Sequence, residues 1–131
     1  MKKLTILFIL LVSTVIFSSP SYAGWTRVSS SGGGANTFYV DFDRIRKVDG
    51  YVYYWYMTDH LQPTKYGDLS SKTYHQGDCK LFRYKILGDS YYTQPMGQGI
   101  PSTSSNKPDK EWSHPPPNSS IEAMLKSVCS R

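Results

Sequence analysis

The chain has two cysteines, Cys79 and Cys129, and the compartment in which it folds decides what they do. A cysteine beside an apolar run can be a core residue, a nucleophile, a metal ligand or half of a disulfide. In an oxidising compartment paired thiols become disulfides. Two cysteines allow only one intramolecular pairing, so the compartment would also fix the connectivity.

The first residues indicate export. Lys2 and Lys3 precede an apolar stretch at 4–17, and small side chains at Ser21 and Ala23 occupy the −3 and −1 positions of a cleavage site before Gly24. This pattern predicts a cleaved secretory signal peptide over residues 1–23. The alternative is a transmembrane anchor, but the apolar run is shorter than the roughly 20 residues that span a bilayer. We therefore expect no membrane span in the mature chain.

Export predicts a Cys79–Cys129 disulfide, and residues 24–131 have a length suited to a single domain. A closed loop of about 50 residues is worth roughly 4 kcal/mol in the chain-entropy model. Two of the fifteen basic residues lie in the leader, which leaves thirteen against ten acidic residues, a net charge of +3. This balance in an exported chain argues against nucleic-acid binding and leaves only an unspecific attraction to anionic surfaces.

The front of the predicted domain has the composition of strands. Residues 37–42 and 51–59 are dense in aromatic and β-branched side chains, and Val48-Asp49-Gly50 between them favours a tight turn. Residues 24–30 could add an edge strand, followed by a flexible loop at 31–36. This spacing of short strands and turns predicts an antiparallel meander of about five to six strands.

We expect a further strand to run through Cys79 at residues 79–87, with a reversal at Gly88-Asp89. The apolar alternation of this segment places Phe82 and Tyr84 on the face opposite Cys79. A bulge or a cover on both faces would be needed to reconcile them. Residues 97–118 then read as an irregular loop, either functional or held in place by packing of Trp112.

The end of the chain predicts a short helix. Ser119 and Glu122 have the spacing of a capping box. The apolar positions that follow are spaced as on one helical face: Ile121, Met124, Leu125, Val128 and Cys129. The predicted fold class is therefore α+β, an antiparallel sheet packed by a C-terminal helix that the disulfide ties to the sheet.

The residue types that carry catalysis do not form a recognisable constellation. Asp41 and Asp43 could be paired carboxylates, but a strand-end cap is the favoured interpretation. His75 and Cys79 could be half of a zinc site, but Cys79 is assigned to the disulfide, and a lone surface histidine is the better interpretation. We therefore predict a protein that is not an enzyme, with no catalytic residue, no metal site and no cofactor.

Tyrosine is unusually frequent, with eleven in the chain, and the residues at 51–56 alternate in a strand. Tyr51, Tyr53 and Trp55 share one face, while Tyr54 and Tyr56 share the other. One face must be core, and the other is either covered by a second layer or is an aromatic contact surface. We predict a binding face among Tyr51, Tyr53, Tyr54, Trp55 and Tyr56, with basic residues such as Arg44, Arg46 and Lys47 at its rim.

Several of these features together resemble one family. The elements that carry the resemblance are Trp25, Tyr39-Val40-Asp41 followed by Ile45, the strand with Trp55, Asp78-Cys79-Lys80, Trp112 and the final helix at 118–129. The chain resembles the surface-adhesin protein E-like domain of Gram-negative bacteria over its whole predicted mature length. The resemblance implies an antiparallel sheet, a C-terminal helix and a disulfide, and a founding member that binds host matrix and serum proteins.

The leading functional hypothesis is thus a small exported binding domain, periplasmic, secreted or displayed at the surface, that contacts host or cell-surface proteins. The alternative is a periplasmic inhibitor of a cell-wall hydrolase such as lysozyme, in which the Ser29–Asn36 loop would enter a carbohydrate cleft. A lysozyme-inhibition assay would separate the two hypotheses.

Overall fold

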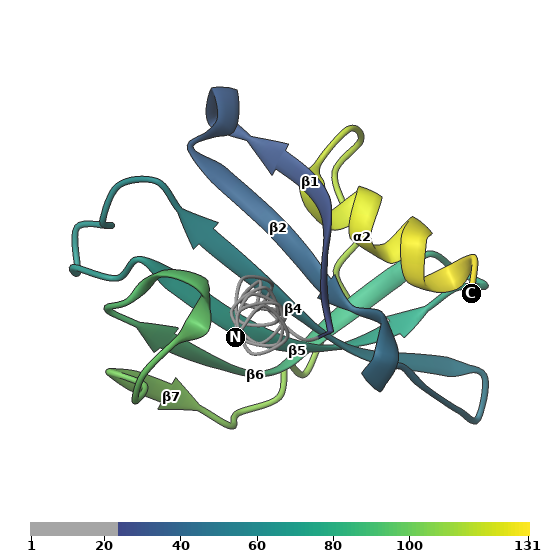
Figure 1. The fold of residues 1–131 in the computed structure, drawn as a ribbon. Coiled ribbons are helices and arrows are strands. Elements are labelled where there is room, and N and C mark those ends of the chain that lie inside the picture. The colour runs from purple at the N-terminus through teal and green to yellow at the C-terminus, as the bar shows by residue number, and fades with distance from the viewer. Residues whose placement is uncertain (1–23) are drawn as a thin grey trace, which may run out of the picture.

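Seven antiparallel strands form one sheet in the computed structural model, which describes residues 24–131 (Figure 1). The strands are β1 (Trp25–Ser31), β2 (Asn36–Asp41), β3 (Arg46–Val48), β4 (Tyr51–His60), β5 (Ser70–Asp78), β6 (Arg83–Tyr92) and β7 (Thr103–Ser105), and one α-helix follows, α2 (Ser120–Cys129). The order across the sheet is β1-β2-β4-β5-β6-β7, with β3 paired to β4 beside this path. The predicted α+β class is confirmed, with one strand more than expected. The predicted signal peptide lies outside the described residues.

The predicted tight turn before β4 is present. Asp49 and Gly50 have φ angles of 52° and 81° and connect β3 to β4, as the left-handed conformations of a tight hairpin require. The predicted edge strand is β1, which pairs with β2 alone. Ser29 and Ser30 belong to β1, so the loop between β1 and β2 is shorter than the Ser29–Asn36 segment of the inhibitor hypothesis.

The prediction of a strand through Cys79 was wrong. The chain reverses at Cys79–Phe82, because the Asp78 carboxylate accepts hydrogen bonds from the backbone N–H groups of Lys80 and Leu81, both at 3.1 Å. Phe82 completes the turn with φ of 50°. Since Cys79 lies in a turn, the strand alternation of β6 does not govern its direction, and the conflict seen in the sequence disappears.

The predicted reversal at Gly88 was also wrong, because Gly88 lies inside β6. The β5–β6 register shifts between Tyr74 and His75, so β6 contains a bulge immediately before Gly88. Steric contact with β7 explains why position 88 is a glycine. A Cβ atom on Gly88 would lie 2.9 Å from the backbone oxygen of Ser105 in β7, so glycine permits this close approach of the two strands.

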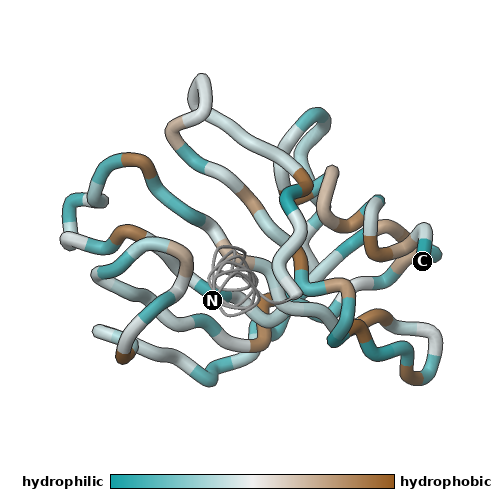
Figure 2. The backbone as a smooth tube through the Cα atoms, in the orientation of Figure 1, coloured by the Kyte–Doolittle hydropathy of each residue, from teal (hydrophilic) through white to brown (hydrophobic). Residues whose placement is uncertain are grey.

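The core lies between α2 and one face of the sheet. Met124, Leu125 and Val128 are fully buried against Val40 and Tyr54. Burying an aliphatic side chain of this size stabilises the fold by about 1.5–3 kcal/mol. Figure 2 shows hydrophobic and hydrophilic positions alternating along α2, as expected for a helix with one buried side.

A glycine in β5 allows the helix to approach the sheet closely. A Cβ atom on Gly77 would lie 2.8 Å from Leu125 Cδ1 and 2.9 Å from Val52 Cγ1. These separations are too short for carbon atoms in contact, so a larger residue at position 77 would push α2 away from the sheet.

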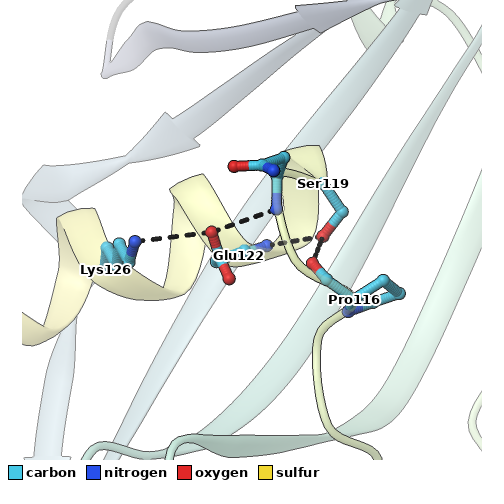
Figure 3. Close-up of polar contacts among 5 residues, drawn as sticks. Pro116, Ser119, Glu122 and Lys126 are labelled. Carbon is cyan, nitrogen blue, oxygen red and sulfur yellow. Dashed lines mark hydrogen bonds and ion pairs between the residues drawn. The ribbon is translucent and has the colours of Figure 1, made fainter.

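The start of α2 has the predicted cap (Figure 3). The Ser119 hydroxyl accepts a hydrogen bond from the backbone N–H of Glu122 at 3.1 Å and donates one to the carbonyl oxygen of Pro116 at 2.7 Å. The Glu122 carboxylate accepts from the backbone N–H of Asn118 at 3.2 Å and pairs with Lys126. This network satisfies backbone donors that the first helical turn leaves free.

The Cys79–Cys129 disulfide is formed and joins the β5–β6 turn to the last residue of α2, with the two Cα atoms 5.6 Å apart. A ten-residue helix is marginal on its own in water. The cross-link and the buried face together hold α2 on the sheet. Within residues 24–131, no helix has the length and apolar composition to cross a membrane.

Candidate interaction surface

Strand β4 separates its aromatic residues between the two faces of the sheet. Tyr54 is fully buried and Tyr56 is 9% exposed, and both lie in the core under α2. Tyr51, Tyr53 and Trp55 point to the opposite face and are half-buried. Three of the five residues predicted as a binding face therefore lie together at the surface, while Tyr54 and Tyr56 are not accessible to a partner.

The rings on the outer face pack on one another. Trp55 stacks on Tyr74 of β5 with ring centroids 4.9 Å apart, and Tyr53 lies 6.3 Å from the same ring. At the start of β4, Tyr51 stacks on Trp112 at 5.5 Å. We call these five residues, Tyr51, Tyr53, Trp55, Tyr74 and Trp112, the aromatic face.

Two of the five residues come from outside the predicted set. Trp112 was predicted to hold the 97–118 segment by packing, and it does so by folding onto Tyr51. The same segment is further fixed where Tyr84 and Ser113 exchange two backbone hydrogen bonds of 2.9 Å. Tyr74 was not singled out, although its cross-strand pairing with Trp55 would have indicated it once the β4–β5 register was known.

Cationic side chains lie over the aromatic face. The guanidinium of Arg83 and the ammonium of Lys85 are 4.4 Å and 4.9 Å from the centre of the Trp112 ring, and Arg46 is 6.0 Å from that of Tyr53. Such contacts are favourable and also restrict the rings. The Asp78 carboxylate forms an ion pair with the guanidinium of Arg83, with 2.9 Å between Oδ2 and Nε. This pair offsets part of the positive charge.

A cationic side chain also lies over aromatic rings nearer to β1. Lys72 lies 6.0 Å from the Trp25 ring centre and 5.0 Å from that of Tyr92. Burial lowers the pKa of Lys72, and the nearby Arg44 lowers it further. The main cause is the burial of the ammonium group, and the charge of Arg44 is the smaller one. Of the predicted rim residues, Arg46 borders the aromatic face, whereas the Lys47 ammonium contacts the C-terminal Arg131 carbonyl instead.

The predicted strand-end cap at Asp41 is present. Its carboxylate accepts from the backbone N–H of Asp43 at 3.2 Å and pairs with Arg44, at the start of the short helix η2 (Phe42–Arg44). The side chain is 3% exposed and engaged in these local contacts. Within residues 24–131, no three His, Cys, Asp or Glu side chains gather as metal ligands would.

The prediction that His75 is a surface histidine was wrong. The side chain is fully buried on the helix side of β5, where it stacks on Tyr84 at 4.9 Å between ring centroids. Its Nδ1 lies 3.1 Å from the Tyr54 hydroxyl. Position 75 shares the parity of the core residues Thr73 and Gly77, and polar neighbours in the sequence concealed this.

The fold and this surface define a small disulfide-linked α+β domain with one covered and one aromatic sheet face. The family model described as surface-adhesin protein E matches residues 25–130, and the chain belongs to this family.

Solved structures of Haemophilus influenzae protein E share the fold. One crystal form is 15% identical over 88% of this chain and 97% of the other, with a TM-score of 0.62. A selenomethionine form is 15% identical over 82% and 87% of the two chains, with a TM-score of 0.61. At this identity the similarity establishes a common fold. No curated protein matches the sequence of the chain.

Proposed function

We propose that this protein is an exported, non-enzymatic binding domain that contacts a host or cell-surface protein through its aromatic face. The observation that carries the proposal is the set of half-buried rings on the sheet face opposite α2. Buried rings would need no further explanation, since they stabilise the core. Rings at a surface that are already packed against one another are typical of the anchors of protein interfaces.

The packing of the rings supports binding because it prepares them for contact. Trp55 and Tyr74 lie on paired strands and stack, so their side chains lose little conformational freedom when a partner arrives. The basic side chains around them favour a partner with an acidic surface. Charges of this kind mainly set the association rate and the salt response.

The disulfide supports a location outside the cytoplasm. Cytosolic thiols are kept reduced, whereas a Cys79–Cys129 bond persists in the periplasm, in the medium or at the cell surface. The family to which the chain belongs is that of surface-adhesin protein E. We place the site of action in the bacterial envelope or beyond it.

The proposal is tested with residues 24–131 and a panel of immobilised host matrix proteins, host serum proteins and intact host cells. Trp55→Ala and Tyr74→Ala should each reduce affinity for a bound partner by more than about fivefold, because truncating an interface anchor costs over 1 kcal/mol. Leu81→Ala, an exposed apolar residue in the β5–β6 turn outside the aromatic face, is the control and should bind as the unmodified protein does.

Thermal unfolding of each variant accompanies the binding measurement. A variant that folds normally and has lost affinity supports the proposal. If every loss of affinity follows a loss of stability, or if no member of the panel binds, the aromatic face is a structural feature and the proposed function is wrong.

A further inference from the structure

A cleft lies outside the aromatic face. It has a volume of about 390 Å³ and is lined by Tyr66, Asp68, Tyr91, Ser102 and Thr103. Its walls come from the β4–β5 loop and from β6 with the segment that leads into β7, at the end of the sheet away from the C-terminus (left in Figure 1). The volume falls within the roughly 300–1,000 Å³ of small-molecule sites.

The first wall is an exposed ring on an ordered turn. Tyr66 is 78% exposed. The turn beneath it is closed by backbone hydrogen bonds of 2.9 Å from Gly67 to Thr64 and from Thr64 to Asp68. The Thr64 hydroxyl also accepts from the backbone N–H groups of Tyr66 and Asp68, both at 3.3 Å. The turn therefore fixes the backbone beneath Tyr66, while the ring itself remains open to a ligand in solvent.

The floor and the second wall are fixed by hydrogen bonds as well. Asp68 is 9% exposed, and its carboxylate accepts from the Ser102 hydroxyl at 3.0 Å. The Ser102 backbone N–H donates to the Tyr91 carbonyl at 2.8 Å, and Thr103 pairs with Tyr91. Tyr91 is 37% exposed and forms the opposite wall. The cleft thus combines two tyrosine rings, a carboxylate and two hydroxyl side chains in a preformed arrangement.

The chemistry of these groups restricts the ligand. The Asp68 carboxylate accepts hydrogen bonds and would repel an anion. The Lys65 ammonium already lies 5.0 Å from the centre of the Tyr66 ring, so a second cation there would be repelled. A purely apolar ligand would bury the carboxylate and add no donor to the Ser102 hydroxyl that it already has, at a cost in free energy. An uncharged ligand that is rich in hydroxyl groups and has an apolar face satisfies all three conditions.

We propose that this cleft binds a neutral saccharide. The C–H face of a sugar ring would pack on Tyr66, one or two of its hydroxyl groups would donate to the Asp68 carboxylate, and Ser102 and Thr103 would bond further hydroxyls. The site is separate from the aromatic face, so the two proposals stand or fall independently.

The test begins with residues 24–131 on an array of neutral oligosaccharides built from hexoses and N-acetylhexosamines, with sulfated oligosaccharides as comparison. The best neutral binder is then titrated and followed by amide chemical shifts. Tyr66→Ala should weaken binding at least tenfold, while Tyr66→Phe keeps the ring and should stay within about twofold. Asp68→Asn should weaken binding at least fivefold. Trp55→Ala is the control for the other face and should leave binding unchanged.

The proposal is overturned if no neutral oligosaccharide binds, or if only sulfated ones do. It is equally overturned if basic peptides shift the cleft amides in preference to sugars, or if Tyr66→Ala binds normally. Asp68 is buried, so Asp68→Asn could unfold. In that event the Tyr66→Ala and Tyr66→Phe pair decides the matter, because Tyr66 is exposed and its replacement leaves the core intact.

Discussion

His75 is the residue whose burial is least expected from the sequence. Among residues 24–131 its Nε2 is the one buried side-chain polar atom without a hydrogen-bond partner. Three tyrosine side chains face the imidazole: Tyr54 and Tyr56 from β4, and Tyr84 from β6. Burial lowers the pKa of His75 from 6.5 to about 3. Burial also raises the pKa of each of these tyrosines, so none supplies a negative charge that would stabilise a protonated imidazole.

This lowered pKa makes the fold sensitive to acid. Below pH 6.5 the unfolded chain binds a proton at His75 that the folded chain does not bind until about pH 3, so stability falls as the pH decreases across that window. At about 1.4 kcal/mol per pH unit, the loss between pH 7 and pH 4.5 should be about 2.5 kcal/mol. Urea unfolding at the two pH values measures it.

His75→Phe serves as the control, since it keeps an aromatic ring and removes the titrating group. This variant should be less stable at pH 7, because the Tyr54 hydroxyl loses its partner, but its pH dependence should be shallower by most of that amount. If the variant keeps the full pH dependence, groups other than His75 cause it.

Helix α2 is the element that depends most on its two attachments, the Ser119 cap and the disulfide. Ser119→Ala should reduce the free energy of unfolding by about 1 kcal/mol, the usual cost of losing an N-cap. Replacing both cysteines by Ala should cost about 4 kcal/mol through the closed loop of 50 residues. Denaturant unfolding compares the two variants.

Ser127→Ala is the matched control in the same helix, because its hydroxyl donates a hydrogen bond to the Met124 carbonyl oxygen of the preceding turn and caps no helix end. It should change stability by less than 0.5 kcal/mol, in line with about ±0.5 kcal/mol for surface changes. Equal shifts for the Ser119 and the double cysteine variants, or no shift for the cysteines, would contradict the docking of α2 through the disulfide.

Local patterns predicted the elements whose stability is local. The Asp49-Gly50 turn follows from backbone conformations that few residues adopt, and α2 from a cap and a helical apolar repeat. The turn at Cys79–Phe82 was missed because it depends on one side chain, Asp78, that bonds two backbone N–H groups beyond the strand. Nothing in the composition of residues 79–87 distinguishes this turn from a strand.

At the scale of the whole molecule, one layer of helix covers one face of the sheet. The alternation within β4 was evident in the sequence, but which parity faces α2 depends on the pairing of four strands and on where the helix docks. The same limit applies to the candidate surfaces. Trp112 stacks on Tyr51, and Tyr66 lines the same cleft as Tyr91. Both arrangements depend on long-range packing of the loops that carry Trp112 and Tyr66, and the sequences of these loops have no periodicity.

The aromatic face is the surface that we propose contacts a host or cell-surface protein. Hydroxyl-radical footprinting tests this contact directly, with residues 24–131 free and in complex with the host protein or cell that binds best. Trp55 and Tyr74 should be oxidised in the free protein, because they are half-buried, and protected in the complex. Leu81, 55% exposed in the β5–β6 turn, should be oxidised equally in both states. Unchanged oxidation of Trp55 and Tyr74 in a saturated complex would contradict the account.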